Sequence, residues 1–138
     1  YPWGHSWVND TLIPVPSDSD YHLDFTEPAG DINIKLKDYI RYLQLNLQGL
    51  KGHSNYLKGA TYRFMHKGIS DYALGWYNSY ENNTDYSTHA GTAGTYYTLV
   101  AIDREKYTGY IIFTNAFHSG VINGVRLLMR KLKEHYSR

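Results

Sequence analysis

The most regular pattern of apolar residues lies near position 40. Apolar side chains recur there every three or four residues, as on the buried stripe of an amphipathic helix. The stripe consists of Leu36, Tyr39, Ile40, Leu43 and Leu47. Gly49 and Gly52 follow it, and glycine is frequent where helices end. The pattern therefore predicts a helix over about residues 34–48.

A less regular apolar pattern follows at residues 55–66. Its apolar residues are Leu57, Tyr62, Phe64 and Met65. Ser54 or Asn55 could cap this helix, because short polar side chains accept hydrogen bonds from its first free N–H groups. Gly59 weakens the pattern, since glycine costs about 1 kcal/mol relative to alanine inside a helix. We therefore expect residues 31–66 to be mainly helical.

Beyond the second helix the apolar period shifts towards two, which is typical of strands. Strand patterns cover residues 72–80, 86–102 and 108–115, the second of them interrupted by two glycines. Turn-forming segments at 81–85 and 103–106 separate them. Because short links join antiparallel neighbours, this part predicts an antiparallel sheet of about three strands.

The chain closes with a helical pattern at residues 119–136. Its expected buried face is Val121 or Ile122, Val125, Leu128 or Met129, Leu132 and Tyr136. The basic residues beside this stripe are interpreted as a solvated helix face; they are Arg126, Arg130, Lys131, Lys133 and Arg138. Residues 1–30 hold all four prolines and no sustained period, so they are expected to be irregular.

The order of these patterns predicts one α+β domain over residues 1–138. Helices precede strands within residues 70–116, and a C-terminal helix packs on the sheet. The length of 138 residues suits one domain. Fourteen Lys and Arg balance 13 Asp and Glu, which gives no sign of a nucleic-acid partner.

Composition also removes several kinds of chemistry. Without cysteine the chain has no disulfide, thiolate metal site or cysteine nucleophile. The seven histidines lack ligand spacing such as His-x-x-x-His, so no metal is expected. No apolar run approaches the roughly 20 residues of a transmembrane segment.

Three ordered segments resemble the end of serine β-lactamase-like hydrolases. They are His89-Ala-Gly-Thr-Ala-Gly94, Leu99-Val-Ala-Ile-Asp-Arg-Glu-Lys106 and Tyr110-Ile-Ile-Phe-Thr-Asn-Ala116. This group includes class C β-lactamases, penicillin-binding proteins such as D-alanyl-D-alanine carboxypeptidases, D-aminopeptidases and related esterases. Its third motif is Lys-Thr-Gly, or His-x-Gly in many relatives.

Upstream segments are similar to the same group. Pro28-Ala-Gly-Asp-Ile32 and Lys37-Asp-Tyr-Ile-Arg-Tyr42 resemble the entry into a helix of these proteins. Tyr72-Ala-Leu-Gly-Trp76 resembles the strand before the third motif. The resemblance covers about residues 25–138 and implies the C-terminal part of a β-lactamase-like fold.

The resemblance implies a substrate-binding strand formed by His89, Ala90, Gly91 and Thr92. In this group the strand edge pairs with substrate backbone, and the N–H after the glycine, here of Thr92, is an oxyanion-hole donor. His89 takes the place of the motif's cation; alternatively it is an ordinary strand residue with local hydrogen bonds. Ala90 replaces a hydroxyl residue, which weakens the expectation of β-lactam or peptide-carboxylate recognition. No cofactor is implied.

The nucleophile of this group is absent from the chain. Its chemistry needs a Ser-x-x-Lys motif, in which a neighbouring base activates the serine, and no serine here has lysine three residues on. Tyr80-Glu-Asn82 matches the Tyr-x-Asn motif literally, but it falls in an expected turn. The chain also starts at Tyr1 without methionine. We therefore expect a C-terminal fragment whose main partner is the missing N-terminal part of the same fold.

Several alternatives stay open. The complete hydrolase would act on a small acyl substrate or peptide in a bacterial cell envelope, periplasmic or secreted, and the fragment alone would be inactive. Alternatively, the 15 tyrosines and three tryptophans suit a carbohydrate or cell-wall binding module without catalysis. Apolar faces that once met the missing part also predict self-association.

Overall fold

The computed structural model describes residues 2–16, 27–30 and 32–136. Its main sheet is antiparallel throughout, with the strand order β3-β4-β5-β6-β7. These strands are β3 (Tyr72–Ala73), β4 (Trp76–Glu81), β5 (Thr84–Thr92), β6 (Tyr97–Asp103) and β7 (Thr108–Thr114). The α+β class is therefore confirmed, whereas the expected number of about three strands is wrong.

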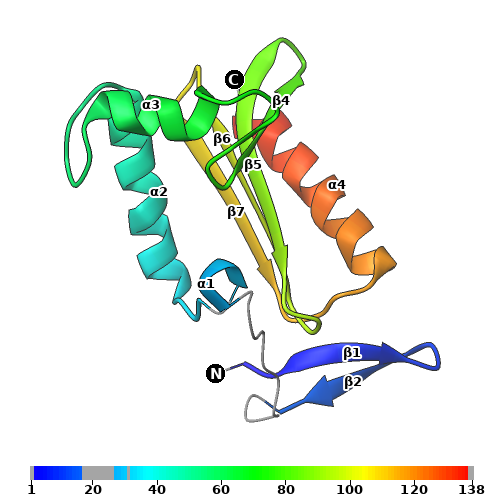
Figure 1. Ribbon diagram of the computed structural model, residues 1–138. Helices are drawn as coiled ribbons and strands as arrows, with labels where there is room; N and C mark the ends of the chain where they lie inside the picture. Colours follow the sequence, from blue (N-terminus) through cyan, green and yellow to red (C-terminus); the bar gives the residue numbers. More distant parts are fainter. Residues whose placement is uncertain (1, 17–26, 31, 137–138) are drawn as a thin grey trace.

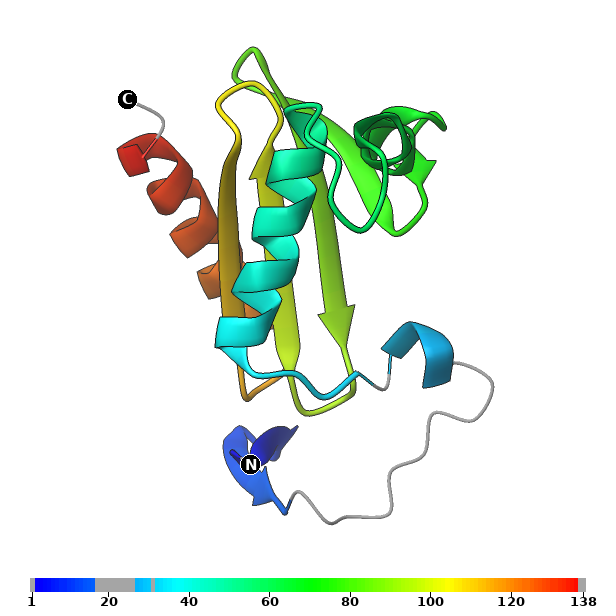
Figure 2. The same cartoon turned by 90° about the vertical axis from the view of Figure 1, so that its left-hand side faces the viewer.

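Helices cover both faces of the sheet. The helices of the described part are α1 (Glu27–Gly30), α2 (Leu36–Leu50), α3 (Gly59–Lys67) and α4 (Ser119–Tyr136), of which α2, α3 and α4 contact the sheet. Helices α2 and α4 lie on opposite sides of the sheet (Figures 1 and 2). Helix α3 packs against α2 and the short strands β3 and β4. No helix within the described ranges combines the length and apolar character needed to cross a membrane.

Two apolar clusters hold the layers together. The α4-side core consists of Tyr86, Tyr97, Ala101, Tyr110, Ile112, Val125 and Met129. The α2-side core consists of Leu43, Leu50, Trp76, Val100 and Ile102. Successive strand residues point to opposite faces, so β6 contributes Ala101 to one core and its neighbours to the other.

Positive-φ residues explain why the strand pattern was misread. Gly75 has φ of 86° and turns the predicted strand 72–80 back on itself, which gives β3 and β4. Gly94 has φ of 78° and divides the predicted strand 86–102 into β5 and β6. Glycine adopts this conformation readily because it has no Cβ. Gly75 and Gly94 are therefore turn residues, whereas Gly91, also inside the second predicted strand, lies within β5.

Residues 1–30, expected to be irregular, contain a hairpin. Strands β1 (Gly4–Val8) and β2 (Thr11–Val15) pair in register. Asn9 and Asp10 join them with φ of 47° and 59°, the left-handed pair of a type I′ turn. The Asn9-Asp10 pair, which favours such a turn, was the sequence signal for the hairpin. The nearby prolines led to the expectation of irregular structure instead. The edge strand tolerates Pro14 because an edge position can lack an N–H donor.

The helix boundaries differ from the prediction in an informative way. Helix α4 begins and ends at the predicted residues. Helix α3 begins at Gly59, so neither Ser54 nor Asn55 caps it; its N-cap is Lys58, without a side-chain hydrogen bond. The Asn55 side chain instead donates to the Leu45 carbonyl of α2 and accepts from the Tyr62 hydroxyl. Asn55 therefore ties the two helices together.

Gly49 lies inside α2 and does not end it. The residue is buried, and a Cβ at this position would overlap the aromatic ring of Tyr62 on α3. The missing side chain is what allows the two helices to approach. Gly124, within α4, has open space where its Cβ would be.

We predict opposite effects for the same substitution at these two glycines. Gly49→Ala should lower the free energy of unfolding by about 1–3 kcal/mol, because the added methyl group overpacks the α2–α3 contact. Gly124→Ala, the matched control, should raise it by about 0.5–1 kcal/mol through helix propensity alone. Urea denaturation followed by circular dichroism measures both. A stabilised Gly49→Ala variant would contradict the packing argument.

Candidate functional site

The predicted substrate-binding residues lie on an open strand edge. Strand β4 pairs with β5 only as far as Tyr77 opposite Thr88. Residues 89–92 of β5 pair with β6 on their other side, from His89 opposite Val100 to Thr92 opposite Tyr97. Among the described residues, no strand pairs with the opposite edge of this segment. The backbone there is free to pair with an added strand.

The four residues are divided between the two faces of the sheet. Because side chains alternate along a strand, His89 and Gly91 share a face with Ser87, on the α2 side. Ala90 faces the other side, where it lines a groove beside α4. Ala90 and Thr92 are exposed, whereas His89 and Gly91 are half-buried. The structure thus brings the four together along one edge but not on one surface.

The His89 backbone pairs with Val100 of β6, but the His89 side chain is not fully hydrogen-bonded to the described residues. Its Nδ1 is closed off from solvent and has no partner in the described part of the chain. A buried polar atom without a partner costs about 1–3 kcal/mol. Such an atom calls for an explanation, and an absent ligand or protein segment is one.

The turn after β5 is stabilised by Thr92. Its hydroxyl donates to the Tyr96 carbonyl at 2.7 Å and accepts from the Gly94 N–H at 3.2 Å. The hairpin β1–β2 lies against the same turn (Figure 1), with the His5 N–H donating to the Thr95 carbonyl at 3.3 Å. A Cβ on Gly4 would overlap the Thr95 side chain. The end of the open edge is therefore fixed by contacts from the start of the chain.

A buried guanidinium fixes the other end of β5. Arg104 Nη1 donates to Asn78 Oδ1 at 2.7 Å, the Tyr86 carbonyl at 2.9 Å and Ser87 Oγ at 2.8 Å. Its side chain is 10 % exposed and lies 3.6 Å from Asp85. These contacts join β4, β5 and the β6–β7 turn. Sequence reasoning placed Arg104 in a plain connection and missed this role.

The same β6–β7 turn is organised by Asp103. Its carboxylate accepts the N–H groups of Glu105 and Lys106 at 2.9 and 2.7 Å, an arrangement for which aspartate is favoured at the start of turns. The turn closes at Tyr107, whose φ is 54°. The expected tight connection at 103–106 is confirmed, with Asp103 as its anchor.

A second buried polar cluster lies between α2, α3 and β4. His66 is fully buried, stacks on Trp76 at 4.5 Å and hydrogen-bonds through Nε2 to Asn46 Oδ1 at 3.0 Å. Burial, together with the smaller effect of the positive charge of Arg104, lowers the pKa of His66 from 6.5 to about 4. The imidazole is therefore neutral at pH 7 and serves the packing of these elements.

Tyr80-Glu-Asn82 lies away from the open edge. Tyr80 pairs with Asp85, four residues before His89 along β5, or roughly 13 Å at the usual rise per residue. Asn82 and Asn83, with φ of 50° and 59°, form the β4–β5 turn. Only Asn82 of this motif lies in the turn, since Tyr80 and Glu81 end β4, and the turn expected over 81–85 is limited to residues 82–83. Within the described ranges, no three His, Asp or Glu side chains cluster as metal ligands would.

Comparison with known protein families, characterised proteins and solved structures finds no match to this chain.

Protonation of His66 should make the stability depend on pH. The unfolded chain takes up this proton below about pH 6.5, whereas the fold resists it until about pH 4, so stability falls as the pH drops between the two. Over this interval the wild type should lose about 3 kcal/mol through His66. His66→Gln should remove that part of the loss, as measured by urea denaturation across the interval.

The matched control is His53→Gln, at an exposed loop position. This variant should keep the wild-type dependence on pH. Equal curves for the wild type and His66→Gln would show that His66 does not control the acid sensitivity of the fold.

Proposed function

We propose that this chain is the C-terminal part of a serine acyl-transfer hydrolase of the β-lactamase-like class. The observation that carries the proposal is the open edge at residues 89–92, where β5 runs past the end of its partner β4. The His-Ala-Gly segment that resembles the third motif of these enzymes lies on this edge. An α+β sheet with a C-terminal helix on one face is compatible with the proposal.

In this proposal the edge binds the substrate as an added strand. Main-chain hydrogen bonds supply affinity and orientation. Gly91 carries no side chain that would keep the substrate away from the strand. The Thr92 N–H would donate to the oxyanion of the tetrahedral intermediate, a contact whose loss costs about 2.7–4 kcal/mol of barrier in other hydrolases.

The proposed role of His89 is that of a positioned cation. Protonated, it would offer the substrate carboxylate a charge-assisted hydrogen bond. Its buried and unpartnered Nδ1 is compatible with a site whose remaining wall comes from elsewhere. Ala90, exposed on the opposite face, offers no hydrogen bond through its side chain.

The nucleophile in this proposal comes from outside the 138 residues. A surface that could receive the remaining part is the outer edge of β7, which pairs only with β6 within the described chain. Its sequence, Thr-Gly-Tyr-Ile-Ile-Phe-Thr, contains neither charge nor proline. Natural edge strands that face water usually carry charged residues or proline, which prevent pairing with another strand. We therefore propose that a strand of the missing part covers this edge.

A specific observation also favours the alternative of carbohydrate binding. The rings of Tyr72 and Tyr77 lie 4.5 Å apart on β3 and β4, and both side chains are exposed. Exposed aromatic pairs are suited to the apolar faces of sugars. Retention of the chain by insoluble peptidoglycan, lost in Tyr77→Ala, would favour this function over acyl transfer.

The proposal predicts binding without turnover. Added acyl-D-alanyl-D-alanine peptide should shift the amide NMR signals of residues 89–92, and Gly91→Val should weaken binding by about tenfold by blocking the edge. Gly109→Ala on β7 is the control, since its new methyl meets Leu43 and Leu47 only at ordinary contact distance. A chromogenic β-lactam or p-nitrophenyl ester should not be turned over.

Two results would contradict the proposal. One is turnover that is abolished by replacing a serine within these 138 residues. The other is peptide binding that shifts signals away from β5 and is unaffected by Gly91→Val. Thermal denaturation of the variant establishes that it is folded before either comparison is made.

A further inference from the structure

A groove lies between α4 and the sheet, apart from the α2-side core. Its volume is about 580 Å³, within the usual range for sites that hold a small molecule. Strands β5 and β6 form its floor with Tyr86, Ala90, Tyr97 and Leu99, and Met129 contributes from α4. The floor is therefore largely apolar and aromatic.

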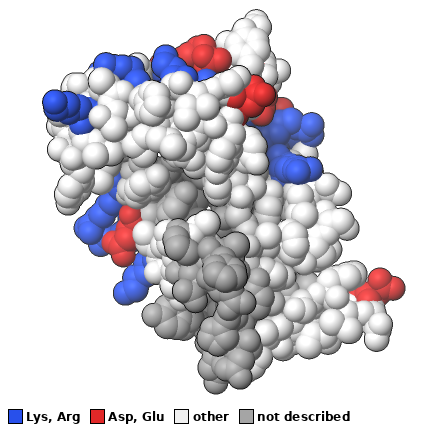
Figure 3. All heavy atoms as spheres, viewed as in Figure 1, with Lys and Arg blue, Asp and Glu red and all other residues white. Residues whose placement is uncertain are grey.

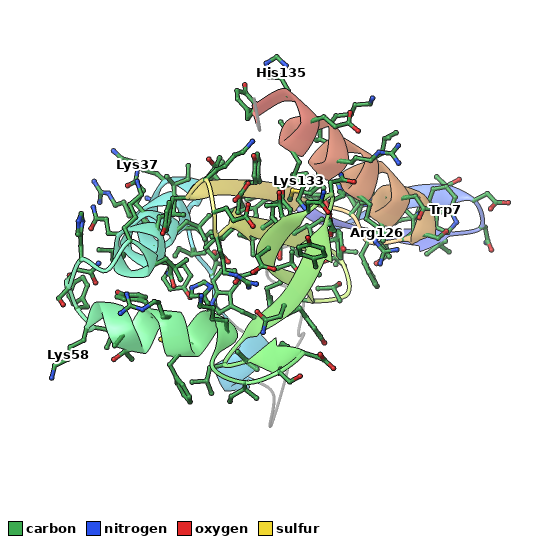
Figure 4. All side chains as sticks on the ribbon, turned by 90° about the horizontal axis from the view of Figure 1, so that it is seen from above. Trp7, Lys37, Lys58, Arg126, Lys133 and His135 are labelled. Atoms are coloured by element: carbon green, nitrogen blue, oxygen red, sulfur yellow. The ribbon has the colours of Figure 1, made fainter. Side chains whose placement is uncertain are left out.

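The rim of the groove is rich in cations from α4. Arg126, Arg130 and Lys133 all line it, and their spacing of four and three residues places them on one side of the helix. Figure 4 shows Arg126 and Lys133 on the side of α4 turned towards the strands. In Figure 3, Lys and Arg side chains (blue) gather on the α4 side of the molecule, next to a few Asp and Glu side chains (red).

Lys133 is not the solvated residue that the sequence predicted. Its side chain is only 12 % exposed, and its Nζ lies 2.8 Å from Glu81 Oε2 and 3.8 Å from the centre of the Tyr86 ring. The ammonium group thus bridges α4 to the end of β4, where both residues line the groove. Its charge is compensated within the protein.

The carboxylates of the groove are also occupied. Glu81 pairs with Lys133, and Glu134 lies 3.3 Å from Lys131 and 3.9 Å from Arg130. Arg126, by contrast, has no hydrogen bond or ion pair with any other residue in the described part of the chain. The groove therefore combines an apolar floor with one guanidinium that lacks an anion.

We infer that this groove binds a small amphipathic carboxylate, with its apolar body on the floor and its carboxylate at Arg126. A guanidinium can hold a carboxylate through two parallel hydrogen bonds. The aromatic and aliphatic floor favours an organic body over an inorganic anion. The inference does not depend on acyl transfer, since the groove lies on the face opposite to His89.

Octanoate is a suitable probe of this site. Calorimetry at low salt should detect saturable binding of octanoate, and octanamide, with the same chain but no charge, should bind about tenfold more weakly. Arg126→Gln should weaken octanoate binding by about tenfold and leave octanamide binding unchanged. NMR shifts should centre on the floor residues Leu99 and Met129, outside the edge segment 89–92.

The matched control is Arg41→Gln, which removes an exposed arginine paired with Asp38 on α2. Octanoate affinity of this variant should stay within about twofold of the wild type. Thr88→Trp, which fills the groove from its floor, should abolish binding in a protein that remains folded. Equal losses in Arg126→Gln and Arg41→Gln, binding that survives Thr88→Trp, or no saturable binding would overturn the inference.

Discussion

The constraint on which the rest of the structure depends is that β6 is buried on both faces. Val100 and Ile102 pack under α2, while Tyr97 and Ala101 pack under α4. A strand covered on both sides has to be almost continuously apolar, and the run Leu99-Val-Ala-Ile102 meets this requirement. Because β6 also carries the register of β5 and β7, the two helices and both neighbouring strands take their positions from it.

Polar contacts of Arg104 connect β6 to the neighbouring strands β4 and β5. Arg104, immediately after β6, holds Asn78 of β4 and Ser87 of β5 in one hydrogen-bonded group. The pairing of β4 with β5 extends only to Thr88, opposite Tyr77, and the open edge of β5 begins at the next residue. A buried cation is tolerated only when its hydrogen bonds are largely made. The position of the open edge therefore depends on the Arg104 guanidinium, which lies outside the proposed site.

The sequence predicted the elements that depend on local patterns and missed those that depend on tertiary contacts. Helix α4 was predicted correctly because its apolar period runs uninterrupted for the whole helix. The short strands β3 and β4 were merged, because one glycine with positive φ separates them. The candidate edge could be located from its motif, but its openness depends on where β4 begins to pair with β5, at Tyr77. The groove between α4 and the sheet could not be predicted, because the residues that meet at its rim, Glu81 and Lys133, lie 52 residues apart in the sequence.

The attachment of the β1–β2 hairpin has a consequence for folding kinetics. Its contacts with the sheet join residues 90 to 112 positions apart, as in the hydrogen bonds from His5 to Thr95 and from Asn115 to Trp3. Closing such long loops costs entropy before any contact is gained, and contacts of this separation slow folding. Their partners lie in the β5–β6 turn and just after β7, which exist only once the sheet has formed. The β1–β2 hairpin, although it precedes the main sheet in the sequence, is thus among the last elements to reach its native place.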